Sequence, residues 1–289
     1  MRLLAPLLLL LAAGLALAGC SPVTILNAFV PEGRLERTSG IAYGDLPRQR
    51  LDVYVPRAKP AQSPAPVVVF FYGGRWQQGE RASYLFVAEA LTAQGFVVVV
   101  PDYRVYPAVQ YPGFLDDGVR AVAWTKREIA RFGGDPARVF LMGHSAGAHI
   151  AAMLAYDEEF LAREGLRRAD VRGVIGLAGP YDFLPLTDAD LVGVFSAAPS
   201  LEATQPIRYV HGGEPPSLLI TGDADTTVKP GNTVRLAARL REAGSAVVEH
   251  HYAHLNHYTL LARLAAPLRM DDLTQEIAAF VRGESVNRR

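Results

Sequence analysis

The sequence predicts an α/β fold, with a mostly parallel sheet covered by helices on both faces and a small cap inserted. Short apolar runs rich in β-branched residues alternate with segments in which apolar residues recur every three or four positions. Continuous apolar runs are typical of strands buried on both faces, as in parallel sheets. Half of the 289 residues are hydrophobic and a fifth are charged, which supports a large core and excludes intrinsic disorder.

The elements follow in order along the chain. Leu51–Val55 alternates like a half-buried strand, whereas residues 21–34 and 56–66 are Pro-rich or polar and predict linkers. Buried strands are predicted over 67–71, 96–100, 139–142, 174–177 and 218–220, and a last strand over 246–252. Helices are predicted over 80–94, 114–131, 148–156 and 231–243.

Residues 183–214 interrupt this alternation between two core strands. They hold scattered Pro, Gly and Ser and one weak apolar cluster over 191–195. A segment of this length without a strong pattern is usually functional, so it predicts a small cap over the strand ends. The alternative is a surface excursion without contact to a ligand.

The first nineteen residues predict a leader. Arg2 precedes an apolar run from Leu3 to Leu17 that suits a signal peptide, and residues 17–20 (Leu-Ala-Gly-Cys) resemble a bacterial lipobox. We expect a lipoprotein signal peptide over 1–19, a tether over 20–34 and one catalytic domain over 35–289, with acyl chains on Cys20 as a membrane anchor. Ser21 favours the periplasmic side of the outer membrane in a Gram-negative host. The alternative is a plain secretory leader with an incidental cysteine.

Charge and cysteine content exclude several classes of protein. The chain has 29 basic residues (Lys plus Arg) and 29 acidic ones (Asp plus Glu). It therefore lacks the basic excess that would indicate a nucleic-acid partner. The single cysteine excludes a disulfide framework and a Cys-cluster metal site. Four histidines between positions 250 and 257 lack an accompanying acidic ligand set, and 246–252 reads as a strand that would splay the first pair. We expect neither a metal nor a cofactor; the sequence does not give the oligomeric state.

Residues 143–147 (Gly-His-Ser-Ala-Gly) lie between a predicted strand and a predicted helix. This strand–turn–helix context is the one in which a Gly-x-Ser-x-Gly turn lifts a nucleophilic serine above the sheet. We therefore predict Ser145 as a nucleophile. The N–H of Ala146 would point toward the oxyanion that forms at the attacked carbonyl.

A second glycine-rich turn, residues 72–76 (Tyr-Gly-Gly-Arg-Trp), follows the strand 67–71. Its main-chain N–H groups around Gly74 and Arg75 are predicted to complete the oxyanion hole with Ala146. Trp76 either walls the acyl site or packs in the core. Tyr72 and His144 are further candidates for lining the substrate.

A serine nucleophile needs a base, which follows the serine and the acid in this type of fold. His144 and His149 lie within the elbow and its helix, and His211 lies in the cap. His257, in the loop after the last strand, is the predicted base; His254 is the alternative.

The acid is predicted from the turn after the strand 218–220. Asp225 lies deep in that turn and is favoured over Asp223, which is expected to bond backbone amides. Asp182, after the preceding strand, is a third candidate that is expected instead to cap the 183–214 segment.

Four motifs together resemble the α/β-hydrolase carboxylesterases: residues 72–76, 102–104 (Asp-Tyr-Arg), 132–138 and 143–149. The chain is similar from about Leu51 to Pro267 to the bacterial feruloyl-esterase-type (BD-FAE-like) and prenylcysteine-methylesterase-like branch, with kynurenine formamidase and hormone-sensitive-lipase-like enzymes as relatives. The resemblance implies the same three side chains and oxyanion donors. Two positions depart from it: Tyr72 stands where the family usually has histidine, and Arg75 where many relatives have glycine.

These observations predict a serine hydrolase that cleaves small esters through an acyl-enzyme. The alternatives are an arylformamidase-like amidase, a lipase, or a non-catalytic binding protein on the same fold. A lipase is less favoured because residues 183–214 lack a long amphipathic apolar helix. The sequence does not indicate the acyl or alcohol part of the substrate.

Overall fold

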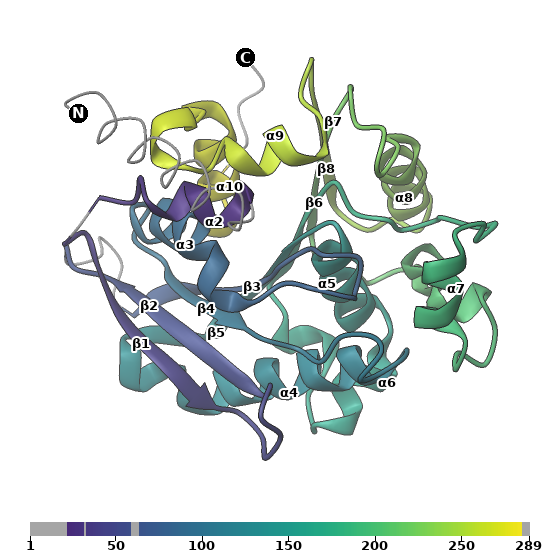
Figure 1. Cartoon of the computed structure of the whole chain (residues 1–289), viewed down its shortest axis with the longest axis horizontal. Helices are drawn as coiled ribbons and strands as arrows, with labels where there is room; N and C mark the ends of the chain where they lie inside the picture. Colours follow the sequence, from purple (N-terminus) through teal and green to yellow (C-terminus); the bar gives the residue numbers. More distant parts are fainter. Residues whose placement is uncertain (1–21, 32, 59–63, 285–289) are drawn as a thin grey trace, which may run out of the picture.

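One eight-stranded sheet forms the centre of the protein (Figure 1). The structure is a computed structural model that describes residues 22–31, 33–58 and 64–284. The strand order is β1-β2-β4-β3-β5-β6-β7-β8. The strands are β1 (Leu35–Ala42), β2 (Arg50–Pro56), β3 (Ala65–Phe71), β4 (Val97–Pro101), β5 (Gly134–His144), β6 (Gly173–Leu177), β7 (Ser217–Gly222) and β8 (Val247–Tyr252).

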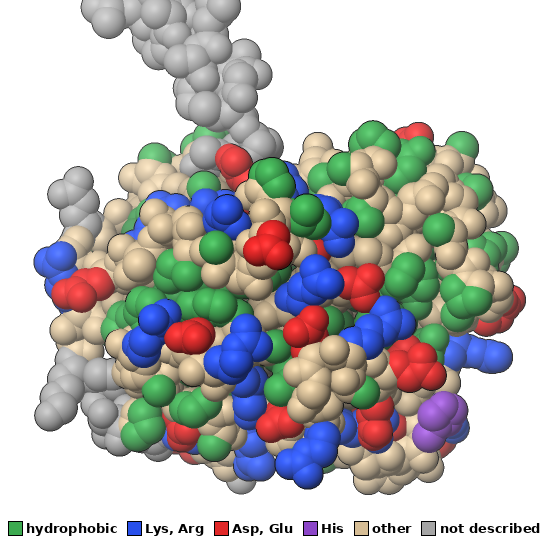
Figure 2. Space-filling view, turned by 90° about the horizontal axis from the view of Figure 1, so that it is seen from below, with side chains coloured by type: hydrophobic (Ala, Val, Ile, Leu, Met, Phe, Trp, Pro, Cys, Tyr) green, Lys and Arg blue, Asp and Glu red, His purple; other side chains and the backbone are tan. Residues whose placement is uncertain are grey.

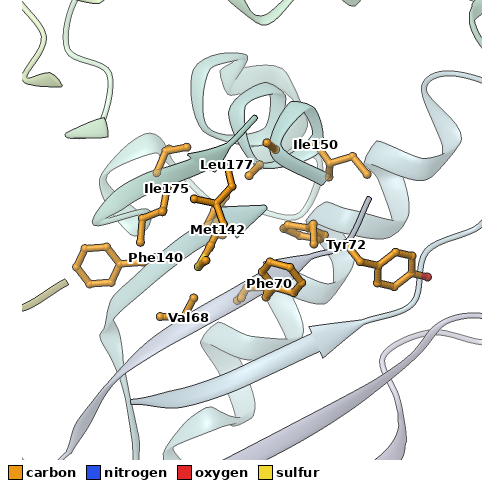
Figure 3. Close-up of a cluster of buried hydrophobic side chains, with 14 of the residues drawn as sticks. Val68, Phe70, Tyr72, Phe140, Met142, Ile150, Ile175 and Leu177 are labelled. Atoms are coloured by element: carbon orange, nitrogen blue, oxygen red, sulfur yellow. The ribbon is translucent and has the colours of Figure 1, made fainter. Parts of the chain in front are cut away.

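Strands β3 to β8 run parallel, whereas β1 pairs antiparallel with β2 and β2 pairs antiparallel with β4. Every residue of β3, β4, β6 and β7 is buried, as their continuous apolar runs predict. Figure 3 shows this core where Val68 and Phe70 of β3 approach Phe140 and Met142 of β5. The predicted fold class is confirmed.

Helices cover both faces of the sheet (Figure 1). One face carries α3 and α10, which contact each other, and the other carries α4 and α5. The α-helices are α2 (Pro22–Asn27), α3 (Leu85–Thr92), α4 (Gly113–Glu128), α5 (Ala146–Tyr156), α6 (Glu158–Arg163), α7 (Ala189–Phe195), α8 (Gly231–Glu242), α9 (His257–Ala262) and α10 (Asp271–Arg282). Short 3₁₀ helices are η1 (Arg81–Tyr84), η2 (Ile129–Phe132), η3 (Arg168–Asp170), η4 (Glu202–Thr204), η5 (Pro206–Tyr209) and η6 (Ala266–Leu268).

The prediction of a linker without regular structure over 21–34 is wrong for α2. Cys20 and the leader lie outside the described residues. The Asn27 side chain donates to the carbonyl of Ala82 at 2.9 Å and accepts from the N–H of Phe86 at 3.1 Å. Leu26 and Val30 pack against the core. These contacts hold the short helix against η1 and α3. A helix this short is not stable without such contacts.

The segment 183–214 contains α7, η4 and η5 and is bonded to the chain just before α4. Tyr111 donates its N–H to the carbonyl of Val194 at 2.9 Å and its hydroxyl to the carbonyl of Ala203 at 2.9 Å. Gln110 reaches Ser196 at 2.7 Å. The segment is therefore fixed to the body of the protein at several points.

The surface mixes the two signs of charge. Basic and acidic side chains lie next to one another across the face in Figure 2, in keeping with their equal numbers in the sequence. None of the helices within residues 22–31, 33–58 and 64–284 is long and apolar enough to span a bilayer.

Candidate active site

Ser145 stands in a strained turn between β5 and α5. Its backbone has φ 56° and ψ −125°, a conformation that costs a non-glycine residue about 1–3 kcal/mol and is found mainly at functional sites. The turn requires glycine on both sides because a Cβ at Gly147 would lie 2.0 Å from the carbonyl oxygen of Phe71, and one at Gly143 would lie 2.2 Å from the backbone of Gly147. The sequence therefore specifies the turn that presents Ser145.

The loop after β3 lies directly on Ser145. A Cβ built on Gly73 would stand 3.0 Å from the Cβ of Ser145. The next residues turn sharply: Arg75 and Trp76 both have left-handed backbones, with φ of 57° and 58°. Among the described residues, no hydrogen bond uses the N–H of Gly74, Arg75 or Ala146. These three donors are thus available at the place where the two turns meet.

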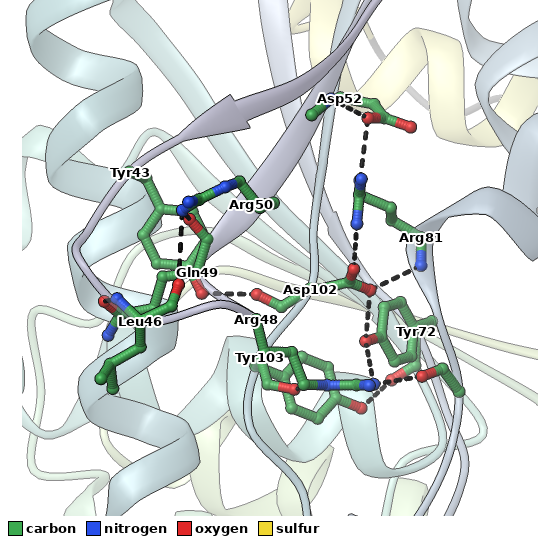
Figure 4. A network of polar contacts seen from close by, with 12 residues as sticks. Tyr43, Leu46, Arg48, Gln49, Arg50, Asp52, Tyr72, Arg81, Asp102 and Tyr103 are labelled. Carbon is green, nitrogen blue, oxygen red and sulfur yellow. Dashed lines mark hydrogen bonds and ion pairs between the residues drawn. The ribbon is translucent and has the colours of Figure 1, made fainter.

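A buried polar network holds the loop after β3 in place (Figure 4). The hydroxyl of Tyr72 donates to Asp102 at 2.8 Å and accepts from Arg48 at 3.1 Å. Arg81 pairs with Asp102 and, at 2.8 Å, with Asp52. Of these acids and arginines, only Asp102, in the motif 102–104, carries a signal in the sequence.

The prediction that Tyr72 lines the substrate is wrong. Its ring is fully buried and stacks between Tyr84, at 5.2 Å, and Tyr103, at 4.7 Å. Burial and the neighbouring Asp102 raise the pKa of its hydroxyl well above 10, so it stays protonated and donates. At the position where the resemblance implies histidine, this chain therefore anchors the loop through a phenol.

The structure brings Asp225 and His257 together. Nδ1 of His257 lies 2.8 Å from Oδ2 of Asp225, and both side chains are buried. Because a carboxylate only accepts, Nδ1 donates, and in the neutral ring Nε2 is then the nitrogen that can accept a proton. Oδ1 of Asp225 accepts from the N–H groups of Thr227 and Val228, both at 2.9 Å, which fixes the carboxylate in its turn.

The competing candidates lie elsewhere. Within the described part of the chain Asp223 bonds no backbone amide, contrary to the prediction; its Oδ1 lies 3.0 Å from Nδ1 of His251 on β8. Asp182 pairs with Arg235 of α8. His254 is exposed in the loop before α9.

His144 packs against His257. Its ring packs on that of His257 at 4.6 Å between centroids, and its Nε2 donates to the main-chain carbonyl of His257 at 3.0 Å. Burial, with His257 adding to it, lowers the pKa of His144 to about 3, so the ring is neutral above acidic pH. This contact orients the first turn of α9, which is a different role from the predicted one of lining the substrate.

The family follows from a comparison of the sequence with family models. Residues 51–240 match the model of the BD-FAE family. The chain belongs to the BD-FAE family. Among curated proteins, this BD-FAE chain is 28% identical to a probable isoprenylcysteine alpha-carbonyl methylesterase, ICMEL1, of Arabidopsis thaliana, over 92% of the chain and 61% of that protein. It is 30% identical to esterase LipQ of Mycobacterium tuberculosis, over 85% of the chain and 62% of that protein. The chain thus spans about three fifths of the length of these relatives.

Solved structures share its α/β-hydrolase fold. Esterase B from Lactobacillus rhamnosis superposes with a TM-score of 0.77 at 21% identity, covering 98% of this chain and 95% of that one. An esterase from Pyrobaculum calidifontis gives a TM-score of 0.72 at 23% identity, covering 92% and 90%. The resemblance inferred from the motifs is confirmed at the level of family and fold.

In this BD-FAE chain, Trp76 joins the loop to the 183–214 segment. The buried indole packs on Phe195 of α7 at 4.9 Å and on His149 of α5 at 5.0 Å, with Phe183 at 6.1 Å. Nε2 of His149 donates to the carbonyl of Thr204 at 2.8 Å. Trp76 therefore packs, as one of its two predicted roles required; its place beside the substrate stays a prediction.

Two of the C-terminal histidines bond acidic side chains. His250 bonds Glu276 at 2.9 Å, and His251 lies between Asp223 and Glu249 at 3.0 Å each. Burial alone would lower the pKa of His251, but the bonds to Glu249 and Asp223 raise it. Within the described part of the chain, no three potential ligands are arranged to hold a metal ion.

Proposed function

We propose that this protein is a serine carboxylesterase that cleaves small esters with Ser145, His257 and Asp225. The observation that carries the proposal is the hydrogen bond of 2.8 Å between Nδ1 of His257 and Asp225, which leaves Nε2 of the neutral ring as the proton acceptor. It is supported by Ser145 in its strained turn, with the Gly73 backbone against its Cβ. A nucleophile, a base and an orienting acid make up the arrangement that activates serine.

The reaction then proceeds in two halves. Oγ of Ser145 attacks the ester carbonyl while Nε2 of His257 takes the hydroxyl proton, and the oxyanion accepts from the N–H groups of Gly74, Arg75 and Ala146. The intermediate collapses, the C–O bond to the alcohol breaks, and His257 returns the proton to the leaving oxygen. Water then attacks the acyl-enzyme with His257 as base, which releases the carboxylic acid and restores Ser145.

The substrate class rests on the relatives. ICMEL1 is named as a methylesterase and LipQ as an esterase, and both match over most of this chain. Because the chain covers about three fifths of each, the activity of the whole relative is carried over only as part of this proposal.

The direct test is Ser145→Ala, assayed with para-nitrophenyl butyrate. We expect kcat to fall by about 10⁴-fold or more, because the nucleophile is lost while the fold is kept. Ser39→Ala, an exposed serine on β1, is the matched control and should retain full activity. Turnover by Ser145→Ala at the wild-type rate, or a wild-type protein that a fluorophosphonate probe does not label, would rule the proposal out.

We also propose that Cys20, outside the described residues, carries the lipid that holds the enzyme at a membrane. The proposal rests on the lipobox-like residues 17–20 and on the apolar leader before them. Expressed in a Gram-negative host, Cys20→Ser should move from the outer-membrane fraction to a soluble or inner-membrane fraction, whereas Ser21→Ala should stay with the outer membrane. An unchanged distribution of Cys20→Ser would exclude lipid anchoring at this residue.

A further inference from the structure

Arg75 extends from the loop over Ser145 to the start of α7. Its Nη2 lies 2.6 Å from Oδ2 of Asp188, the residue that caps the N-terminus of α7. The other carboxylate oxygen of Asp188 accepts from the N–H of Asp190 at 3.0 Å. Both members of the pair are 43% exposed, so the contact lies at the surface beside the candidate site.

The pair is not needed to hold the loop and α7 together. Ion pairs this exposed contribute little to stability, because water screens the charges and both side chains lose freedom. The same two segments are already joined by the buried contact between Trp76 and Phe195 at 4.9 Å. The loop itself is also held by Tyr106, before α4, which donates its N–H to the carbonyl of Trp76 at 2.8 Å. The Arg75 pair is therefore weak enough to open and close without moving the loop.

Most of the guanidinium remains available. Arginine has five N–H donors in a planar fork that suits a carboxylate, and one nitrogen of Arg75 binds Asp188. No other partner of this side chain lies within the described residues. The chain also keeps arginine at a left-handed position that favours glycine, two residues after the Gly73 that touches Ser145.

We propose that Arg75 recognises a carboxylate carried by the ester substrate, and that Asp188 holds the guanidinium until the substrate's carboxylate replaces it. The proposal deepens the proposed esterase function and rests on it. A charged hydrogen bond between Arg75 and the substrate's carboxylate would select anionic esters over neutral ones of the same size.

The experiment compares two matched pairs of esters. In the first pair the carboxylate is on the acyl side: para-nitrophenyl hydrogen adipate against para-nitrophenyl hexanoate. In the second it is on the alcohol side: para-acetoxybenzoate against its methyl ester. The readout is the ratio of kcat/KM for the anionic to the neutral ester, because effects on the oxyanion hole cancel in that ratio.

The two variants should move this ratio in opposite directions for one of the pairs. Arg75→Gln is expected to lower it by about five- to tenfold, since the charged partner is lost. Asp188→Asn keeps an N-cap for α7 but removes the competing charge, so it should raise the ratio by about threefold or more. Arg75→Lys should fall between wild type and Arg75→Gln, and added salt should reduce the wild-type ratio.

Arg120→Gln is the control, because Arg120 forms a similarly exposed ion pair with Glu164 between α4 and α6. It should leave the ratio and the activity unchanged. Equal effects of Arg75→Gln and Asp188→Asn, or unchanged ratios in both, would overturn the proposal and leave the pair as a structural contact. A wild-type enzyme inactive on all four esters would instead overturn the esterase function itself.

Discussion

Replacing His149 by glutamine is expected to change how stability depends on pH. The ring is fully buried among Trp76, Phe183 and Phe195, at 5.0–6.0 Å between ring centroids for Trp76 and the two phenylalanines. Burial lowers the pKa of His149 from 6.5 to about 4, and the bond to the carbonyl of Thr204 only partly opposes it. A protonated ring there would be a charge without a counter-ion.

The sign and size follow from proton linkage. Between pH 6.5 and 4, His149 is protonated in the unfolded chain but stays neutral in the native one. The unfolded state therefore binds more protons, and the free energy of unfolding falls as the pH falls. Each pH unit is worth about 1.4 kcal/mol, so the full interval of 2.5 units gives about 3 kcal/mol. This contribution is present above pH 6.5 and is lost on acidification toward pH 4.

Urea denaturation at constant ionic strength, from pH 7 to pH 4, measures the effect as a difference between wild type and His149→Gln. That difference should shrink by about 3 kcal/mol over the interval, because glutamine does not titrate. Leu154→Ala, on the side of α5 that faces Gly118 of α4, should show a difference independent of pH. A difference for His149→Gln that is constant, or that widens in acid, would refute the reasoning.

Two further changes test the loop and the acid. Tyr72→Phe removes one hydrogen bond from each of two charged side chains, Asp102 and Arg48, and should lower the free energy of unfolding by about 2–3 kcal/mol in urea denaturation; an effect below 0.5 kcal/mol would contradict the anchoring role. Asp225→Asn should lower kcat on para-nitrophenyl butyrate by about 10³–10⁴-fold, and Asp223→Asn by less than about threefold. The reverse order would make Asp223 the acid.

The strands were predictable where burial on both faces forces an apolar run, as in β3 and β4. β1 was missed because most of its residues are exposed, so it carries no such run. β5 begins at Gly134, before the predicted start at 139: Gly134 pairs with Ala65 of β3, but residues 135–138 are partly buried or exposed and carry no apolar run. α2 was missed because contacts of Asn27 with distant residues hold it.

The candidate site divides in the same way. Ser145, Asp225 and His257 were predictable because each follows a strand and their order along the chain is characteristic of this fold. The direction of the Tyr72 ring was not, since its neighbours Tyr84 and Tyr103 come from other segments. The partner of Asp223 was hidden for the same reason, because it depends on where β8 places His251.

The loop over Ser145 shows why these hidden contacts matter for the proposed reaction. Arg75 and Trp76 have consecutive left-handed backbones, and each costs about 1–3 kcal/mol. The buried hydrogen bonds of Tyr72 and the packing of Trp76 on Phe195 offset this cost. The main-chain donors are then held in place before the substrate binds. Donors that need no rearrangement during the reaction stabilise an oxyanion most effectively. Breaking the Tyr72 contacts should therefore lower stability and kcat together, whereas changing the Arg75 side chain should alter mainly the choice of substrate.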